Sequence, residues 1–140
     1  MLLLLYMVNF QKKKIFLGGS TIKLDNWRDN YIKELTNLDC FNPVVKNWSK
    51  EDQLIEKKHR ENDDLLLFCL NGPNLFSIAE VVDCSNKRNK ETILIIDIDK
   101  IKKSKSARIK SMYAIGEMVE NNGSKVFYNH KDCIKYLKQF

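Results

Sequence analysis

Six consecutive apolar residues, Leu65–Leu70, place the strongest constraint on how this chain can fold. The run follows a charged stretch that ends at Asp64, and turn residues close it at positions 71–73. A short apolar run between turn signals is typical of a strand that is buried on both faces, as strands of parallel sheets are. Ligands of such sheets bind outside the carboxyl ends of the strands. The sequence therefore predicts a central parallel strand here, with a pocket just beyond its last residue.

The rest of the chain alternates strand and helix signals. The expected strands are residues 15–17, 41–45, 65–70, 92–96 and 125–128, and the expected helices are 25–36, 50–62, 75–84, 104–121 and a final one that follows Asn129. Such an alternation demands a parallel sheet with helices on both of its faces. Five strands in a chain of 140 residues fit a flavodoxin-like (Rossmann-like), doubly wound sheet in a single domain.

An apolar and basic extension, residues 1–13, precedes this domain of residues 14–140. Its apolar part, residues 1–8, has no basic stretch before it and no small-residue cleavage site after it, unlike a signal peptide. That part is also too short to span a bilayer, so we expect no association with a membrane. Three interpretations stay open: an extra strand, a tail buried against a neighbouring subunit, or a stretch upstream of a true start at Met7.

Charge and cysteine content exclude several classes of function. The net charge of +6 is spread over many lysines, which indicates a solvated surface rather than an anionic partner. No aromatic residue interleaves the basic run at 102–110, so we expect no nucleic-acid partner. The four cysteines lack C-x-x-C spacing, and His59 and His130, expected on helix surfaces, lack a metal-ligand pattern. We therefore expect reduced thiols in a cytoplasmic protein, without a metal or a cofactor.

Two carboxylates flank the central strand along the sequence, Glu56 before it and Glu80 after it. Cleavage of a glycosidic bond with retention needs such a pair, because one carboxylate attacks the anomeric carbon and the other protonates the leaving group. Sequence spacing alone leaves open whether the two side chains meet in space. Glu56 also precedes Arg60 by four residues, an order that favours a surface salt bridge on a helix.

Gly18, Gly19 and Ser20 directly follow the first expected strand. Glycines at such a place let backbone N–H groups approach a ligand closely, but the same residues also make a tight turn. Their spacing is neither that of a dinucleotide-binding fingerprint nor that of a P-loop. The segment is thus compatible with a ligand site and does not define one.

Several short motifs occur together in one order. They are Ile15-Phe-Leu-Gly-Gly-Ser20, Asp25-Asn-Trp-Arg28, Phe41-Asn-Pro-Val-Val45, Trp48, Glu56, Asp64 with the apolar strand, and Ser77-Ile-Ala-Glu80. In this combination the chain resembles the nucleoside 2-deoxyribosyltransferase-like family. The resemblance covers about residues 14–97, and it lies in the order and spacing of the motifs rather than in any one of them.

This resemblance implies roles for the two carboxylates. Glu80 would be the nucleophile that attacks C1′ of a 2′-deoxyribonucleoside and forms a covalent deoxyribosyl ester. Glu56, where many relatives have an aspartate, would protonate the departing base and later deprotonate the incoming one. The resemblance also implies a nucleoside or nucleotide substrate, and a homo-oligomer, because relatives complete their sites with a neighbour's residues. The substrate-binding residues would be Gly18, Gly19, Ser20, Trp48, Asn74 and Ser77.

Some of these positions leave alternatives open. Phe16 stands where relatives often carry a tyrosine that steers the nucleophile, and Tyr113 or Ser77 are the candidates to replace its hydroxyl. Trp48 would either stack on the base or lie in or beside the core. Asn74 stands where nucleoside-using relatives have an acid and nucleotide-cleaving relatives a serine. The alternatives to base exchange are an N-glycoside hydrolase of nucleoside 5′-monophosphates or of an NAD-like dinucleotide, and a non-catalytic nucleotide-binding module.

Overall fold

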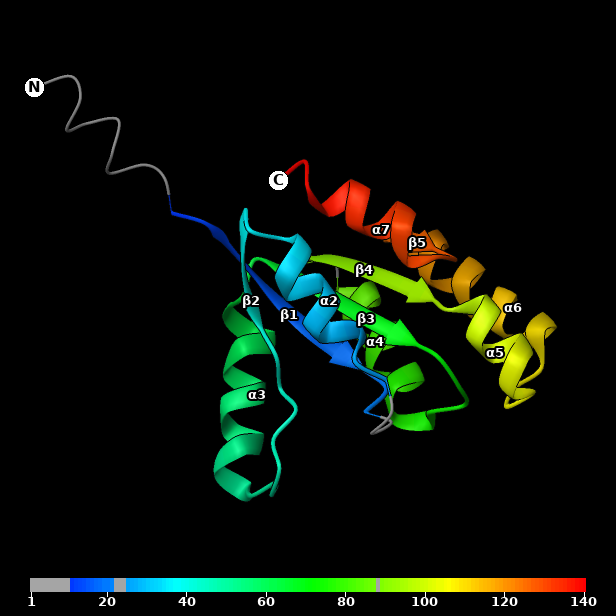
Figure 1. Cartoon of the computed structure of the whole chain (residues 1–140), viewed down its shortest axis with the longest axis horizontal. Helices are drawn as coiled ribbons and strands as arrows, with labels where there is room; N and C mark the ends of the chain where they lie inside the picture. Colours follow the sequence, from blue (N-terminus) through cyan, green and yellow to red (C-terminus); the bar gives the residue numbers. More distant parts are fainter. Residues whose placement is uncertain (1–10, 22–24, 88) are drawn as a thin grey trace, which may run out of the picture.

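The computed structural model describes residues 11–21, 25–87 and 89–140, so most of the expected N-terminal extension lies outside the described residues. Five parallel strands form one sheet in the order β2-β1-β3-β4-β5 (Figure 1). The strands are β1 (Lys13–Gly19), β2 (Leu38–Phe41), β3 (Leu65–Leu70), β4 (Glu91–Ile96) and β5 (Lys125–Phe127). The helices are α2 (Trp27–Glu34), α3 (Lys50–Asn62), α4 (Leu75–Lys87), α5 (Ile98–Ser104), α6 (Ile109–Asn121) and α7 (His130–Leu137). This confirms the predicted flavodoxin-like, doubly wound sheet in a single domain.

The central position of β3 follows from its composition. All six of its residues are buried, and it pairs with β1 on one side and with β4 on the other. A strand of this kind has no polar side chain to present to water, so it is stable only where helices cover both faces. The predicted central strand is therefore confirmed, with the bounds that the sequence indicated.

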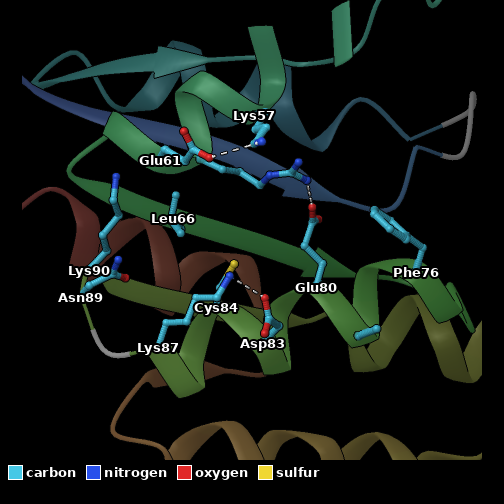
Figure 2. A pocket seen from close by; sticks show the side chains of 12 residues that line it. Lys57, Glu61, Leu66, Phe76, Glu80, Asp83, Cys84, Lys87, Asn89 and Lys90 are labelled. Atoms are coloured by element: carbon cyan, nitrogen blue, oxygen red, sulfur yellow. Dashed lines mark hydrogen bonds and ion pairs between the residues drawn. The ribbon is translucent and has the colours of Figure 1, made fainter. Parts of the chain in front are cut away.

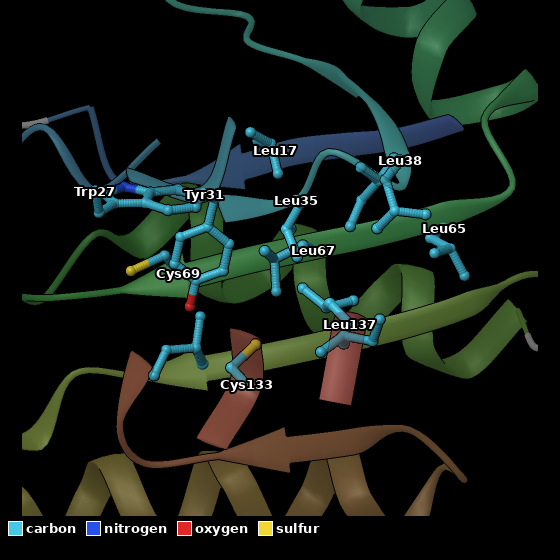
Figure 3. Close-up of a cluster of buried hydrophobic side chains, with 13 residues drawn as sticks. Leu17, Trp27, Tyr31, Leu35, Leu38, Leu65, Leu67, Cys69, Cys133 and Leu137 are labelled. Atoms are coloured by element: carbon cyan, nitrogen blue, oxygen red, sulfur yellow. The ribbon is translucent and has the colours of Figure 1, made fainter. Parts of the chain in front are cut away.

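Two separate apolar cores lie on the two faces of the sheet, because successive side chains of a strand point to opposite faces. On one face, α2 and α7 cover the sheet, and Tyr31, Leu35 and Leu137 pack over Leu17 and Leu67 (Figure 3). On the opposite face, α4, α5 and α6 pack against the alternate residues of the same strands, which include Phe16, Leu66 and Phe68. Helices on both faces leave the carboxyl edge of the sheet as the place where loops can build a site.

Two predicted elements were wrong in extent. The strand expected at 41–45 lies instead at Leu38–Phe41, because Pro43 has no N–H group and the N–H of Val44 bonds to the Asn42 side chain at 3.0 Å. The helix expected at 104–121 begins only at Ile109, as α6, and the preceding helix α5 was not predicted; the chain leaves α5 at Lys105 in a left-handed conformation with a φ of 50°. The side chain of Asp97 starts α5 by accepting a hydrogen bond from the N–H of Lys100 at 3.2 Å.

Helix α3 differs from the other helices in its packing. It begins with a capping box between Ser49 and Asp52, as the sequence predicted, but none of its 13 residues is buried. Figure 1 shows α3 and the loop before it extending away from the sheet beside β2. No helix in the described part of the chain is long and apolar enough to cross a membrane.

Candidate active site

A cleft of about 610 Å³ separates α3 from α4 on the face of the sheet that carries Leu66 (Figure 2). Its volume is in the range of sites for small molecules, about 300–1,000 Å³. Arg60 lines the cleft from α3, and Phe76, Glu80 and Cys84 line it from α4. Of the residues that the sequence predicted for the site, Glu80 is the one that lines this cleft.

The carboxylate of Glu80 is shielded from water and paired with an arginine. Glu80 lies in the second turn of α4, where its side chain is 12% exposed and accepts a hydrogen bond from Nη1 of Arg60. Burial raises the pKa of Glu80, the positive charge of Arg60 opposes that shift, and the negative charge of Glu56 adds to it. The pair joins the two walls of the cleft and keeps a carboxylate charged in a poorly solvated place.

Glu56 lies one turn before Arg60 and therefore on the same face of α3. It is half-buried and does not line the cleft, but its charge acts on Glu80, so the two carboxylates lie within electrostatic range of each other. Arg60 bonds to Glu80 and not to Glu56, so the salt bridge predicted within α3 is wrong. The more buried carboxylate is favoured because a charge pair interacts more strongly where less water screens it.

Gly18 and Gly19 are the last two residues of β1, and the packing around them explains why they are glycines. Gly19 has a φ of +103°, and a Cβ atom there would lie 2.2 Å from the carbonyl oxygen of Cys69. A Cβ atom on Gly18 would lie 2.8 Å from the rings of Phe16 and Phe68. The backbone at the end of β1 thus approaches β3 and two aromatic rings too closely for any side chain, so the two glycines belong to the strand and not to the turn that the sequence also allowed.

Ser20 follows these glycines at the carboxyl end of β1. Its N–H donates to the carbonyl of Cys69 at 3.0 Å, while its buried Oγ has no hydrogen-bond partner among the described residues. A buried hydroxyl without a partner is rare in folded proteins and calls for an explanation such as a bound water or a ligand. Ser20 therefore keeps its predicted place among the candidate substrate-binding residues.

Sequence reasoning missed the residue that holds this loop in place. Arg28 is buried in α2, and its guanidinium donates to the carbonyl oxygens of Leu17 at 2.9 Å, Ser20 at 3.0 Å and Gly19 at 3.2 Å. The same guanidinium lies 4.5 Å from the ring of Trp27. The only sequence signal was the motif at 25–28, in which an arginine follows the tryptophan that anchors the helix.

The remaining predicted residues lie outside the cleft lining. Asn74 caps α4, because its Oδ1 accepts a hydrogen bond from the N–H of Ser77 at 3.1 Å, and Ser77 is buried. Trp48 is 58% exposed on the loop before α3, which excludes a core role and leaves its ring free to stack. Tyr113 is exposed on α6 and packs on Tyr128 at 4.9 Å between ring centroids, so the residue that bonds Glu80 is Arg60.

A second polar network lies at the carboxyl edge on the other face of the sheet. His130 bonds to Asp97 at 3.1 Å and to the hydroxyl of Tyr31 at 2.8 Å, and its hydrogen bond lowers the pKa of Asp97. His59 stacks on Phe41 with ring centroids 3.5 Å apart. Both histidines lie on helices, as expected, but both are half-buried and contact other elements.

No cluster suited to a metal occurs here: within the described residues, no three His, Cys, Asp or Glu side chains come together as a ligand set. Comparison with known proteins found no family model that matches the chain and no significant match among curated proteins. The fold and the cleft therefore define a doubly wound α/β protein with a half-buried carboxylate–arginine pair in a cleft of small-molecule size. A carboxylate held in this way can act as a nucleophile or as an electrostatic partner for a developing positive charge.

Proposed function

We propose that this chain is an N-glycosyl transferase of the nucleoside 2-deoxyribosyltransferase-like type, which exchanges nucleobases on 2′-deoxyribonucleosides in the cytoplasm. The observation that carries the proposal is the carboxylate of Glu80, which is buried in the wall of a cleft, paired with Arg60 and within electrostatic range of Glu56. A retaining reaction at an anomeric carbon needs two carboxyl groups whose different surroundings let one act as nucleophile and the other as acid. The doubly wound sheet and the order of the sequence motifs support the same class of activity.

In the proposed reaction, Glu80 attacks C1′ of the deoxyribose while the bond from C1′ to the base nitrogen breaks. Glu56 donates a proton to the departing base, which leaves a deoxyribosyl ester on Glu80. An incoming base then attacks C1′ and gives its proton to Glu56, and Glu80 departs as a carboxylate. Ser20, through its unpartnered Oγ, and Trp48, through its exposed ring, are the proposed contacts to sugar and base.

The backbone around the carboxyl ends of β1 and β3 completes the proposed site. Gly18 and Gly19 would present N–H groups without side chains in the way. Asn74 and Ser77 shape the start of α4, where a helix N-terminus favours an electronegative group such as the 5′ end of the sugar. No cofactor takes part in these steps.

Base exchange is tested directly with deoxyinosine and free adenine, followed by chromatography of the products. Formation of deoxyadenosine supports the transferase. Release of hypoxanthine and deoxyribose without exchange supports hydrolysis by the same glutamate. Binding of the nucleoside without any turnover would refute both enzymatic proposals and favour a nucleotide-binding module.

Hydrolysis is the second candidate, because the single chain leaves its cleft open. Phe76 lines the cleft and is 71% exposed, so water has access to the cleft, although the carboxylate of Glu80 itself is only 12% exposed. An open site favours attack by water, whereas a buried, base-shaped acceptor site favours transfer. The substrate would then be a nucleoside 5′-monophosphate or an NAD-like dinucleotide, and each is tested in place of deoxyinosine.

Replacing Glu56 with glutamine is expected to lower kcat/KM for base release by about 10²- to 10⁴-fold, because an amide cannot give the departing base a proton. A 2′-deoxyribosyl derivative of cationic 7-methylguanine needs no such proton, so its release should be reduced far less. The measurement is the rate of base release from both substrates in wild type and variant. Equal losses with the two substrates would show that Glu56 is not the acid.

We also propose a homo-oligomer, formed through α3 and the loop before it. This arm, residues 44–58, exposes five large apolar side chains: Val44, Val45, Trp48, Leu54 and Ile55. An exposed apolar patch of this kind marks an interaction surface. The arm holds four lysines against three acidic residues, whereas the whole chain carries a net charge of +6, so two arms repel each other little. A neighbour's arm would cover the open side of the cleft.

The double substitution Leu54→Glu and Ile55→Glu is expected to give monomers, because it places like charges in the proposed contact. Light scattering after size-exclusion chromatography measures the mass of both proteins. Thermal unfolding of the isolated variant chain should be little changed, because none of the residues of α3 is buried in the single chain. Ile32→Glu, an exposed isoleucine on α2, is the matched control. A monomeric wild type, or a variant with unchanged mass, contradicts this interface.

A further inference from the structure

Arg60 makes the ion pair that joins the two walls of the cleft. Two other ion pairs in the cleft, Lys57 with Glu61 at 3.9 Å and Lys87 with Asp83 at 2.9 Å, are exposed and each lies within one helix. The pair of Arg60 with Glu80 differs on both counts, because it connects α3 to α4 and its side chains are only 26% and 12% exposed. Exposed pairs within a helix contribute little, so this buried pair is the one with consequences for the site.

We infer that Arg60 is a positioning residue, which holds Glu80 ionised and aims its carboxylate across the cleft. The inference rests on the proposed function, because it takes Glu80 as the nucleophile. Only the carboxylate form has the electron pair that attacks C1′, so a Glu80 that kept its proton would be inactive. A guanidinium stays charged at any pH of interest and its planar donors fix the direction of a carboxylate.

The surroundings of Glu80 make such a partner necessary. Burial and the charge of Glu56 both favour the protonated form of Glu80, and the charge of Arg60 is what opposes them. Phe16, which stands where the resembled family often carries a tyrosine, is buried against Phe41 and Phe68 and has no polar atom to offer. Arg60 therefore orients the carboxylate of Glu80 by its charge, as a tyrosine hydroxyl at position 16 would do by a hydrogen bond.

Arg60 has a part in both halves of the proposed reaction. When the ester forms, the carboxylate loses its charge and Arg60 loses its partner. When the C1′–O bond breaks in the second half, its electron pair returns to Glu80, and Arg60 stabilises the carboxylate that leaves. The same contact thus keeps the nucleophile ionised at the start and stabilises the leaving group at the end.

The direct test is a titration of the Glu80 side chain by NMR in protein labelled with ¹³C-glutamate, its signal assigned by its loss in Glu80→Gln. In Arg60→Met the pKa of Glu80 should rise by about 1 to 3 pH units, because an adjacent positive charge lowers a carboxyl pKa by that amount. Arg60→Lys keeps the positive charge but lacks the planar pair of N–H donors, so the pKa of Glu80 should rise less in this variant. Lys57→Met, one turn away on the same wall, should leave the titration of Glu80 in place. Circular dichroism confirms that each variant is folded.

The kinetic test follows covalent glycosylation by intact mass across pH in the same variants. In Arg60→Met the acid limb should move to higher pH by the amount that the titration shows, so the loss of rate is greater at pH 5 than at pH 8. If the role of Arg60 were purely structural, its loss would lower the rate equally at every pH. That result, or an unchanged pKa of Glu80 in the titration, would overturn the inference and leave the proposed function standing. An absence of any adduct in wild type would refute the proposed function and the role of Arg60 in it, with the ion pair itself still measured by the titration.

Discussion

Glu80→Gln is expected to abolish the covalent deoxyribosyl adduct and to lower kcat/KM for base exchange by on the order of 10⁴- to 10⁶-fold, as loss of a central catalytic group does in other enzymes. Glutamine keeps the size of the side chain but lacks the anionic oxygen that attacks C1′. It also removes the negative charge that Arg60 now neutralises. The measurement is the intact mass of the protein after incubation with a 2′-deoxynucleoside, with peptide mapping of the modified residue.

The controls for this experiment are simple to read. Glu117→Gln makes the same chemical change at an exposed position of α6 and should retain both adduct and exchange. An adduct that maps to another residue, or one that persists in Glu80→Gln, would remove Glu80 from the role of nucleophile. Because Glu80 is paired on a helix and is not part of an apolar core cluster, the variant should also unfold at nearly the temperature of the wild type.

Gly19→Ala is expected to lower the free energy of unfolding by roughly 3 to 5 kcal/mol, a large part of the 5–15 kcal/mol typical of a domain. The φ of +103° at Gly19 is unfavourable for any residue with a side chain. The added Cβ would in addition lie 2.2 Å from the oxygen and 2.5 Å from the nitrogen of Cys69, and neither backbone atom can move without breaking the pairing of β1 with β3. Urea denaturation of wild type and variant measures the difference.

Gly123→Ala separates the two causes of that loss. Gly123 has a similar φ of +97°, but nothing lies within 4 Å of the place that its Cβ would take. Its substitution should therefore cost only the conformational penalty, about 1–2 kcal/mol. Equal losses at the two glycines would show that the close approach of β1 to β3 has no energetic weight.

Much of the fold could be predicted from local patterns, and the errors have local causes as well. The apolar run at β3 predicts a buried strand, and the structure has one. The helical spacing of Trp27, Tyr31 and Leu35 likewise predicts a buried face for α2, and these residues are buried. The break between α5 and α6 contains no glycine or proline. Instead, Lys105 takes the left-handed conformation that is usually found at glycine. Without such a signal, α5 is not predicted, and the predicted helix begins at residue 104 although α6 begins at Ile109.

The candidate site could be predicted less completely. The position of Glu80 after the central strand follows from the alternation of elements, but the cleft that it lines runs along α4 beside β3 and not beyond the carboxyl end of that strand, and its role as nucleophile stays a prediction. Arg28 and Arg60 were not recognised, because an arginine in a helix gives no sign of whether it will reach carbonyl oxygens or a carboxylate. Trp48 and Asn74 stay predicted substrate contacts, although neither lines the cleft: Trp48 is exposed on the loop before α3, and Asn74 caps α4.

By itself, the sequence determined the sheet, its order of elements and the capping box at Ser49, because these depend on residues a few positions apart and on which faces must avoid water. Only the tertiary structure decided which carboxylate Arg60 would bind. Glu56 lies four residues away on the same helix, and Glu80 lies 20 residues away on another. The fold places α3 across a cleft from α4, where Glu80 is poorly solvated and the attraction between opposite charges is stronger than at the surface of a single helix.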